Sequence, residues 1–301
     1  MNIIGISAFF HDSACCLIRN GVLVAAAEEE RFSRIKADPS IPKLALRYCL
    51  EQGGITMADV DCIAYYENPE KKLARQLWSG VLGNSPELLH SVNPRMVEDQ
   101  IREILGYEGV IKYYDHHLSH AASSFYFSGF EKAAVLTVDG VGEWATTTYG
   151  VGNGKHLEIF EEVEFPDSLG LLYSTITSYL GFGVNDGEYK VMGLAPYGEA
   201  RYTEQIHRLV QQESGGQYRL NMQYFAFLEG QRMYSDALCE LFGRPARPED
   251  AEMEQFHQDI AKSLQVVLEE ILIAKATYLY EKTQAEDLCM AGGVALNCVA
   301  N

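Results

Sequence analysis

The sequence predicts an α/β protein built from two copies of one structural unit. The same run of elements (strand, turn, strand, hairpin turn, strand) occurs at the N-terminus and again from Ala133, and such repetition is typical of a duplicated fold. In both copies helices follow the strands, as in sheets covered by helices. The 301 residues are 47% hydrophobic, which suits two domains, predicted as 1–128 and 129–301.

The first block begins with three predicted strands. Asn20-Gly21 separates the second from the third, and Asn-Gly between two β-rich runs is a strong hairpin signal. The predicted order is βββαβαβ, with strands at 2–7, 14–20, 22–30, 61–67 and 109–115 and helices at 41–53 and within 84–106.

The second block repeats this beginning. Its first turn carries Gly140 and Gly142, whose backbone N–H groups could surround a phosphate held between the two halves. Two ordinary, unrelated hairpins are the alternative. The predicted strands are 133–140, 144–151, 156–165 and 287–292, and the predicted helices are 169–180, 251–282 and one that opens at Gly292-Gly293.

The composition excludes some classes of partner. A formal charge of −18 argues against broad binding of nucleic acid or of anionic membranes, because both reward clustered basic residues. No apolar window is long enough for a membrane span. The seven cysteines are scattered, odd in number and without CxxC spacing, so reduced thiols and a cytoplasmic location are expected.

One histidine cluster has the spacing of a metal site. His116 and His120 are four residues apart, so on a helix they share a face, with Asp115 able to cap its start. Alone, HxxxH favours a structural role. Asp139 ends an apolar strand and would complete a set of two histidines and one carboxylate, although it could instead cap the next turn. His117 points elsewhere and is expected to pack or to form a hydrogen bond.

Other polar residues are candidates for binding or catalysis. His11 is a neutral-pH base in the first turn, fit to deprotonate a hydroxyl, or it hydrogen-bonds the turn. Arg34 and Lys36 could supply positive charge to a phosphate, or they belong to a solvated surface. Glu188 and Lys190 are predicted on a glycine-rich loop, which is either a connector or a functional segment.

Six stretches together resemble the O-carbamoyltransferase family, whose members modify antibiotics and nodulation factors. They run in the same order over residues 3–301: "HDSACCLIRNGVLVAAAEEERFSRIK", "DHHLSHAASSFYFSGF", "LTVDGVGEWATT", "SLGLLYSTITSYLGF", "GEYKVMGLAPYG" and "AGGVALNCVAN".

The resemblance implies an actin/Hsp70/sugar-kinase-type nucleotide-binding fold, akin to the tRNA threonylcarbamoyl transferase catalytic subunit. It also implies ATP-dependent transfer of a carbamoyl group from carbamoyl phosphate, through carbamoyl-adenylate, to a hydroxyl of a small-molecule acceptor. By motif match it implies His11 as general base, His116, His120 and Asp139 as ligands of an iron-type metal, Gly140, Gly142, Gly292, Gly293 and Asn297 at the nucleotide, and Lys36, Glu188 and Lys190 at the substrates.

Family members are considerably longer than this chain. We therefore expect an incomplete second half, no carbamoyl-adenylate-forming C-terminal domain, and no full reaction by the chain alone. A tRNA threonylcarbamoyl transferase-like enzyme is one alternative, but the acidic balance and the "EEERFSRIK" and "GEYKVMGLAPYG" blocks resemble the small-molecule branch. A nucleotide-binding module without catalysis is another, and the presence of His11 and of the histidine–aspartate set argues against it.

Overall fold

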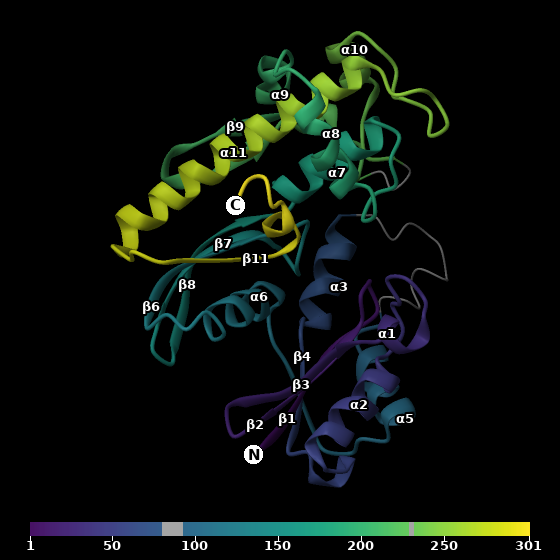
Figure 1. Cartoon of the computed structure of the whole chain (residues 1–301), viewed down its shortest axis with the longest axis vertical. Helices are drawn as coiled ribbons and strands as arrows, with labels where there is room; N and C mark the ends of the chain where they lie inside the picture. Colours follow the sequence, from purple (N-terminus) through teal and green to yellow (C-terminus); the bar gives the residue numbers. More distant parts are fainter. Residues whose placement is uncertain (80–92, 229–231) are drawn as a thin grey trace. The chain divides into compact units, whose positions relative to one another are not determined.

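A computed structural model describes residues 1–79, 93–228 and 232–301 (Figure 1). The described residues form two compact units, with the boundary along the chain between Ser119 and His120. The predicted domain boundary after residue 128 stays a prediction.

The first unit contains a mixed five-stranded sheet. Its strand order is β3-β2-β1-β4-β5; β1 to β3 form antiparallel pairs, whereas β4 pairs in parallel with both β1 and β5. The elements are β1 (Asn2–Ser7), β2 (Ala14–Arg19), β3 (Val22–Glu28), α1 (Glu30–Ser33), α2 (Lys43–Gly53), η1 (Met57–Asp59), β4 (Cys62–Tyr65), α3 (Pro69–Trp78), α5 (Met96–Leu105) and β5 (Val110–Tyr113).

All five predicted strands and both predicted helices of this unit are present, and α5 is the described part of the helical region predicted within 84–106. Residues 84–92 of that prediction lie outside the described residues. Helix α3 was not predicted from the sequence; its residues are polar on average and none of them is buried.

Alternation in β1 explains where the first core lies. Ile4 and Ile6 are buried while their neighbours along the strand are only half-buried, as expected when one face of a strand is packed. The buried face belongs to the same hydrophobic cluster as Leu46 of α2 and Ile101 of α5. A carboxylate fixes the start of α2, because Glu29 accepts hydrogen bonds from the N–H groups of the first turn.

The second unit repeats the strand arrangement of the first. Strands β6, β7 and β8 form antiparallel pairs, and β11 pairs in parallel with β6, giving the order β11-β6-β7-β8. The elements are α6 (His116–Phe125), which includes the boundary, β6 (Lys132–Val138), β7 (Ala145–Asn153), β8 (His156–Glu164), α7 (Leu169–Tyr179), α8 (Glu188–Leu194), η2 (Ala195–Tyr197), α9 (Thr203–Leu209), β9 (Val210–Gln212), η3 (Ser214–Gly216), β10 (Tyr218–Leu220), η4 (Met222–Tyr224), α10 (Asp236–Phe242), α11 (Gln255–Thr283), β11 (Leu288–Ala291) and η5 (Gly293–Leu296).

The common order confirms the predicted α/β fold with internal duplication. In each unit an antiparallel three-stranded meander is extended by a strand that runs parallel to the first strand of the meander. This is the arrangement expected of the actin/Hsp70/sugar-kinase class named above.

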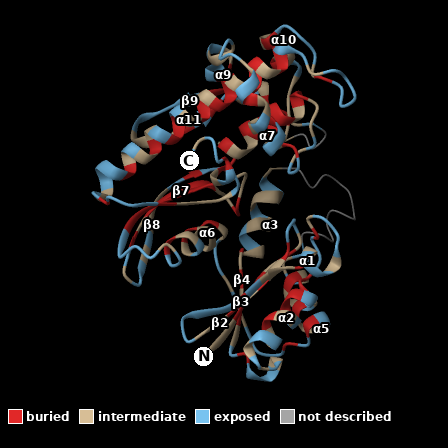
Figure 2. Cartoon of the chain, viewed as in Figure 1, coloured by how far each residue is buried: buried red, intermediate tan, exposed pale blue. Residues whose placement is uncertain are grey.

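Both faces of the second sheet are covered by helices. Along β6, Ala133 and Val135 pack with Phe125 of α6, whereas Leu136 and Val138 belong to the larger core that contains α7 and α11. Figure 2 shows buried residues along the strands of this sheet and along one side of α11.

One predicted helix is wrong. After Gly292-Gly293 the chain forms the short 3₁₀ helix η5 in place of the predicted α-helix, and beyond η5 the side chain of Asn297 accepts the N–H groups of Val299 and Ala300.

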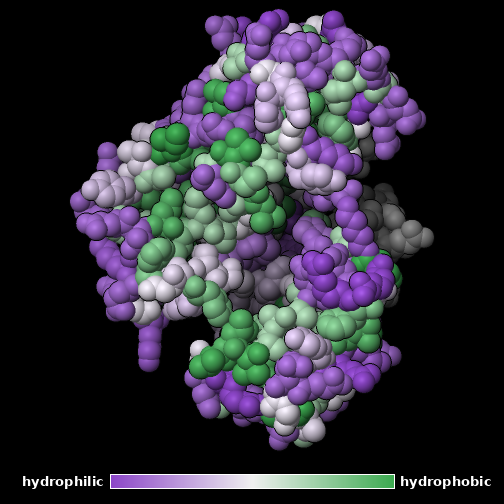
Figure 3. Space-filling model, in the orientation of Figure 1, coloured by the Kyte–Doolittle hydropathy of each residue, from purple (hydrophilic) through white to green (hydrophobic). Residues whose placement is uncertain are grey.

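Hydrophilic side chains cover most of the visible surface around α9 and α10 (Figure 3), in keeping with the acidic composition. Among the described helices, none combines the length and hydrophobicity needed to cross a membrane.

A buried lysine joins three parts of the second unit. Lys275 of α11 is inaccessible to solvent, and its Nζ donates hydrogen bonds to the Tyr149 hydroxyl of β7 at 2.7 Å and to the Gly216 carbonyl at 2.6 Å. The ammonium also lies 4.2 Å from the ring centroid of Tyr218. Burial disfavours the charged amine and lowers the pKa of Lys275 from 10.5 to about 7.

This depressed pKa predicts a pH-dependent stability. Between pH 7 and about 10 the unfolded chain binds more protons than the folded chain, so the free energy of unfolding contributed by Lys275 rises with pH. Lys275→Met removes that contribution. Between pH 7.5 and 9, the free energy of unfolding measured with urea should therefore rise by up to about 1.4 kcal/mol per pH unit more in the wild type than in the variant. Lys282→Met, at an exposed site on the same helix, is the control, and parallel curves for Lys275→Met and wild type would contradict the prediction.

Candidate metal centre and nucleotide loops

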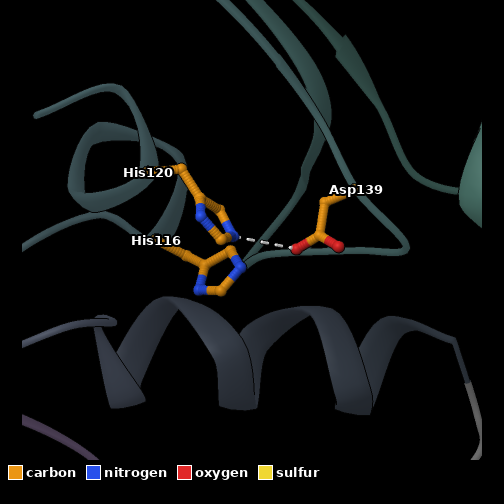
Figure 4. A group of neighbouring side chains, drawn as sticks. All are labelled: His116, His120 and Asp139. Carbon is orange, nitrogen blue, oxygen red and sulfur yellow. Dashed lines mark hydrogen bonds and ion pairs between the residues drawn. The ribbon is translucent and has the colours of Figure 1, made fainter. Parts of the chain in front are cut away.

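Three side chains that are candidate metal ligands converge at the end of β6. His116 and His120 lie one turn apart on α6, and Asp139 directly follows β6. One ligand atom from each lies within 4.8 Å of the other two, and Figure 4 shows the two imidazoles and the carboxylate turned toward one another. Two imidazoles and a carboxylate are a donor set that suits iron, zinc and related ions, with positions left for water or substrate.

The carboxylate of Asp139 is fixed by two contacts within the second unit. Its Oδ2 lies 3.2 Å from Nε2 of His120, and its Oδ1 accepts the backbone N–H of Gly293 at 3.0 Å. The parallel pairing of β11 with β6 brings Gly293 to this place. Asp139, a candidate metal ligand, is therefore in direct contact with the Gly292-Gly293 turn, which was not predicted from the sequence.

The other residues of the histidine run have different surroundings. His117 is buried and its ring packs edge-on against that of His116, at 5.6 Å between centroids. Asp115 does not cap α6 with its side chain as suggested; both carboxylate oxygens lie 2.8 Å from the Nζ of Lys71. Packing is thus the observed role of His117.

A serine organises the turn after Asp139. The Ser168 hydroxyl donates to the Gly140 carbonyl at 2.6 Å and accepts the N–H of Leu171, so one side chain caps α7 and holds the turn. The turn itself closes through the Gly142 N–H and the Ala145 carbonyl. This arrangement brings the start of α7 against Gly140.

Glycine is required where other backbone segments approach the end of β6 most closely. A Cβ on Gly170 would lie 2.6 Å from backbone atoms of Gly140 and 2.7 Å from the carbonyl carbon of Asp139. Gly292 has φ of +99°, and a Cβ there would lie 2.3 Å from the Val138 carbonyl oxygen. Backbone from α7 and from β11 thus flanks the end of β6, as a site for an anionic, close-fitting ligand requires.

Asn297, expected at the nucleotide, makes its side-chain contacts inside the second unit. It is buried and exchanges two amide hydrogen bonds, of 2.9 and 3.1 Å, with Gln265 of α11. Its observed role is to fasten the segment after Gly293 to α11.

Glu188 and Lys190 lie on α8, not on the loop that was predicted. Glu188 is the first residue of this helix; its carboxylate accepts the Ser174 hydroxyl at 2.6 Å and the N–H groups of Asn185 and Gly187. This carboxylate stabilises the start of the helix, so the segment is helical although its three glycines and its proline predicted a loop. Lys190 is exposed, with its Nζ 5.9 Å from the ring centroid of Phe182.

His11 and Lys36 belong to one loop assembly in the first unit. The turn after β1 is tied to the segment after α1 by hydrogen bonds from Phe9 N–H to the Pro39 carbonyl and from Ser13 N–H to the Asp38 carbonyl. His11 is exposed, and its Nδ1 lies 2.7 Å from the carboxylate of Asp12. Lys36 is exposed on the attached segment.

Sequence reasoning missed the residues that position these candidates. Ser168, Gly170 and Asp12 were not singled out, and only the Asp next to His11 gave a visible signal. The contacts of Ser168 and Gly170 join segments about thirty residues apart, so no local pattern reveals them.

These features define an α/β protein with a candidate histidine–carboxylate centre beside glycine turns. The model of the family described as carbamoyltransferase N-terminus matches residues 2–301, so the chain belongs to this family. An uncharacterized protein of Synechocystis is 44% identical over the whole chain, which spans 52% of that protein. The nodulation protein NolNO of Sinorhizobium fredii is 36% identical over 98% of the chain and 42% of its own length.

The chain therefore spans about half the length of these relatives. Among solved structures, HypF of T. kodakarensis matches 98% of this chain and 42% of its own, with 12% identity and a TM-score of 0.44. Component A of (R)-2-hydroxyglutaryl-CoA dehydratase from Acidaminococcus fermentans matches 99% of this chain and 85% of its own, with 12% identity and a TM-score of 0.43.

Removing a candidate ligand should weaken metal binding. We expect His120→Ala and Asp139→Asn each to lower the affinity for Fe²⁺, or for Co²⁺ as a stand-in, by at least about tenfold in calorimetric titrations. His156→Ala, at an exposed histidine of β8, should bind like the wild type. Equal affinities for all four proteins would contradict the assignment of the ligands.

Two glycine substitutions should separate metal binding from folding. In Gly293→Ala the new Cβ would lie 2.8 Å from Oδ1 of Asp139, a side-chain atom that can move, so metal affinity should fall roughly tenfold with a small change in melting temperature. Gly170→Ala instead meets backbone and should lower the unfolding free energy by about 1–3 kcal/mol. Thermal unfolding and metal titration of both variants check this, and a reversed pattern would contradict it.

Proposed function

We propose that this chain carries the transfer region of an ATP-dependent O-carbamoyltransferase. The complete protein would move a carbamoyl group from carbamoyl phosphate, through carbamoyl-adenylate, to a hydroxyl of a small-molecule acceptor such as an antibiotic, a nodulation factor or another metabolite. The observation that carries the proposal is the convergence of His116, His120 and Asp139 beside the Gly292-Gly293 turn, in a chain that matches the carbamoyltransferase N-terminus family throughout.

His116, His120 and Asp139 would hold a divalent metal, which we propose to be iron. When bound, such an ion supplies positive charge to a phosphate oxygen whose negative charge grows as AMP departs. The Gly293 N–H fixes the direction of the Asp139 carboxylate, so the protein prepares the site before the ion binds.

His11 would act as the general base. As the acceptor oxygen forms its bond to the carbamoyl carbon, the bond between that carbon and the adenylate phosphate oxygen breaks, and its electron pair stays on AMP. The hydroxyl proton passes to the imidazole nitrogen of His11. Its exposed position on a turn anchored at both ends supports this role.

Backbone groups would surround the nucleotide phosphates. Gly140, Gly142, Gly292 and Gly293 present main chain without side-chain bulk around the end of β6, which favours an anion. Asn297 would contribute indirectly, since its amide holds Gln265.

The remaining candidates would act at the substrates. Lys36, exposed beside the His11 turn, would supply positive charge to the adenylate or the acceptor. Glu188 would keep Lys190 in place on α8. The charge of −18 supports a small-molecule acceptor over nucleic acid, and the seven free cysteines support a cytoplasmic location.

The test uses the full-length protein that contains this chain. Incubation with ATP, ¹⁴C-labelled carbamoyl phosphate and a panel of hydroxylated metabolites should give labelled carbamate esters and AMP. His11→Asn should lower the rate by roughly 10²- to 10⁴-fold and leave metal content unchanged. Failure of the wild type to label any metabolite would contradict the proposal, and transfer of a threonylcarbamoyl group to adenosine in tRNA would favour the tRNA-modifying alternative instead.

A further inference from the structure

The turn that follows β1 contains an uncommon pair of adjacent polar side chains. Neighbouring residues in an extended chain point to opposite sides, yet Nδ1 of His11 lies 2.7 Å from Oδ2 of Asp12. Asp12 has a φ of +51°, in the left-handed region that Asp tolerates better than most residues. The turned backbone at this position brings the carboxylate back to the preceding imidazole.

The turn is held firmly from outside. Hydrogen bonds of 2.8 Å from Phe9 N–H to the Pro39 carbonyl and of 2.9 Å from Ser13 N–H to the Asp38 carbonyl lie on either side of the pair. Ser13 is fully buried, whereas His11 and Asp12 remain 45% and 50% exposed at their side chains. The ring of Phe10 packs against that of His11 at 4.5 Å between centroids. The backbone on both sides is thus anchored while the imidazole reaches solvent.

We infer that Asp12 is a positioning residue that holds the neutral imidazole of His11 in the Nδ1–H tautomer and so leaves Nε2 as the proton acceptor. A carboxylate accepts hydrogen bonds only, so at 2.7 Å the proton belongs on Nδ1. The opposite tautomer would turn the Nδ1 lone pair toward a negative oxygen. In the described part of the chain no hydrogen bond engages Nε2 of His11. The inference deepens the proposed function and rests on it for its catalytic consequence.

The tautomer decides whether Nε2 of His11 can accept the proton of the acceptor hydroxyl. An imidazole with its proton on Nε2 offers a donor, not an acceptor, to an incoming hydroxyl, whereas the Nδ1–H form offers the Nε2 lone pair. In free imidazole side chains the Nε2–H tautomer is the commoner one, so an unassisted His11 would present the wrong nitrogen most of the time. Asp12 corrects this without touching the acceptor.

The tautomer can be measured on this chain alone. With ¹⁵N-histidine labelling, long-range ¹H–¹⁵N spectra recorded where the ring is neutral should show a pyrrole-type Nδ1 and a pyridine-type Nε2 for His11, assigned by its loss in His11→Asn. Asp12→Gly removes the carboxylate, and glycine tolerates the positive φ. In this variant Nδ1 of His11 should become pyridine-type and Nε2 pyrrole-type. Ala37→Gly relaxes another left-handed residue of the same loop assembly, with φ of +52°, and should leave the spectrum unchanged.

A wild-type His11 with its proton on Nε2, or an Asp12→Gly variant that keeps the Nδ1–H form, would overturn the inference. In full-length enzyme, Asp12→Gly should lower kcat roughly tenfold with KM within about twofold, and Ala37→Gly should match the wild type. An exchanged tautomer with unchanged kcat would refute the positioning role in transfer. Absence of transfer by the wild type would refute the proposed function and that catalytic role, while the spectrum would still decide whether Asp12 sets the tautomer.

Discussion

Parallel pairing of β11 with β6 is the constraint on which the candidate centre depends. It aligns Ala291 with Thr137, so the residues that follow both strands leave the same edge of the sheet. Gly293 then donates its N–H to Asp139, and the carboxylate that could bind a metal is oriented by the turn that could receive a nucleotide. A change in this register would move Gly293 away from Asp139.

Hydrogen bonds from neighbouring segments hold this edge of the sheet in place. Ser168 holds the Gly140 turn and caps α7 with a single hydroxyl, and Gln265 of α11 grips Asn297. Helices on both faces of the sheet bury its apolar side chains. What remains accessible is polar backbone and a few fixed side chains, which is the environment in which charge on a ligand is stabilised without rearrangement.

Loop construction differs between the two copies of the fold. The turn of the second unit uses Gly140 and Gly142, whereas that of the first has no glycine and adopts positive φ at Phe9 and Asp12. Such strained positions persist only where neighbouring structure holds them, and the segment around Asp38 and Pro39 does so. The same fold element can thus present backbone in one copy and a histidine–carboxylate pair in the other.

Alternating and helical hydrophobic patterns by themselves determined the strands of the five-stranded and four-stranded sheets, the long helix α11 and the duplicated order, because they depend on local periodicity. The sequence also singled out His116, His120 and Asp139, since a four-residue spacing on a helix and a carboxylate after a buried strand are local signals. Only the tertiary structure decided that these three meet, that Gly293 fixes Asp139, and that Glu188 begins a helix. Those contacts join segments distant in sequence, and their geometry follows from strand register and helix packing, which no local pattern encodes.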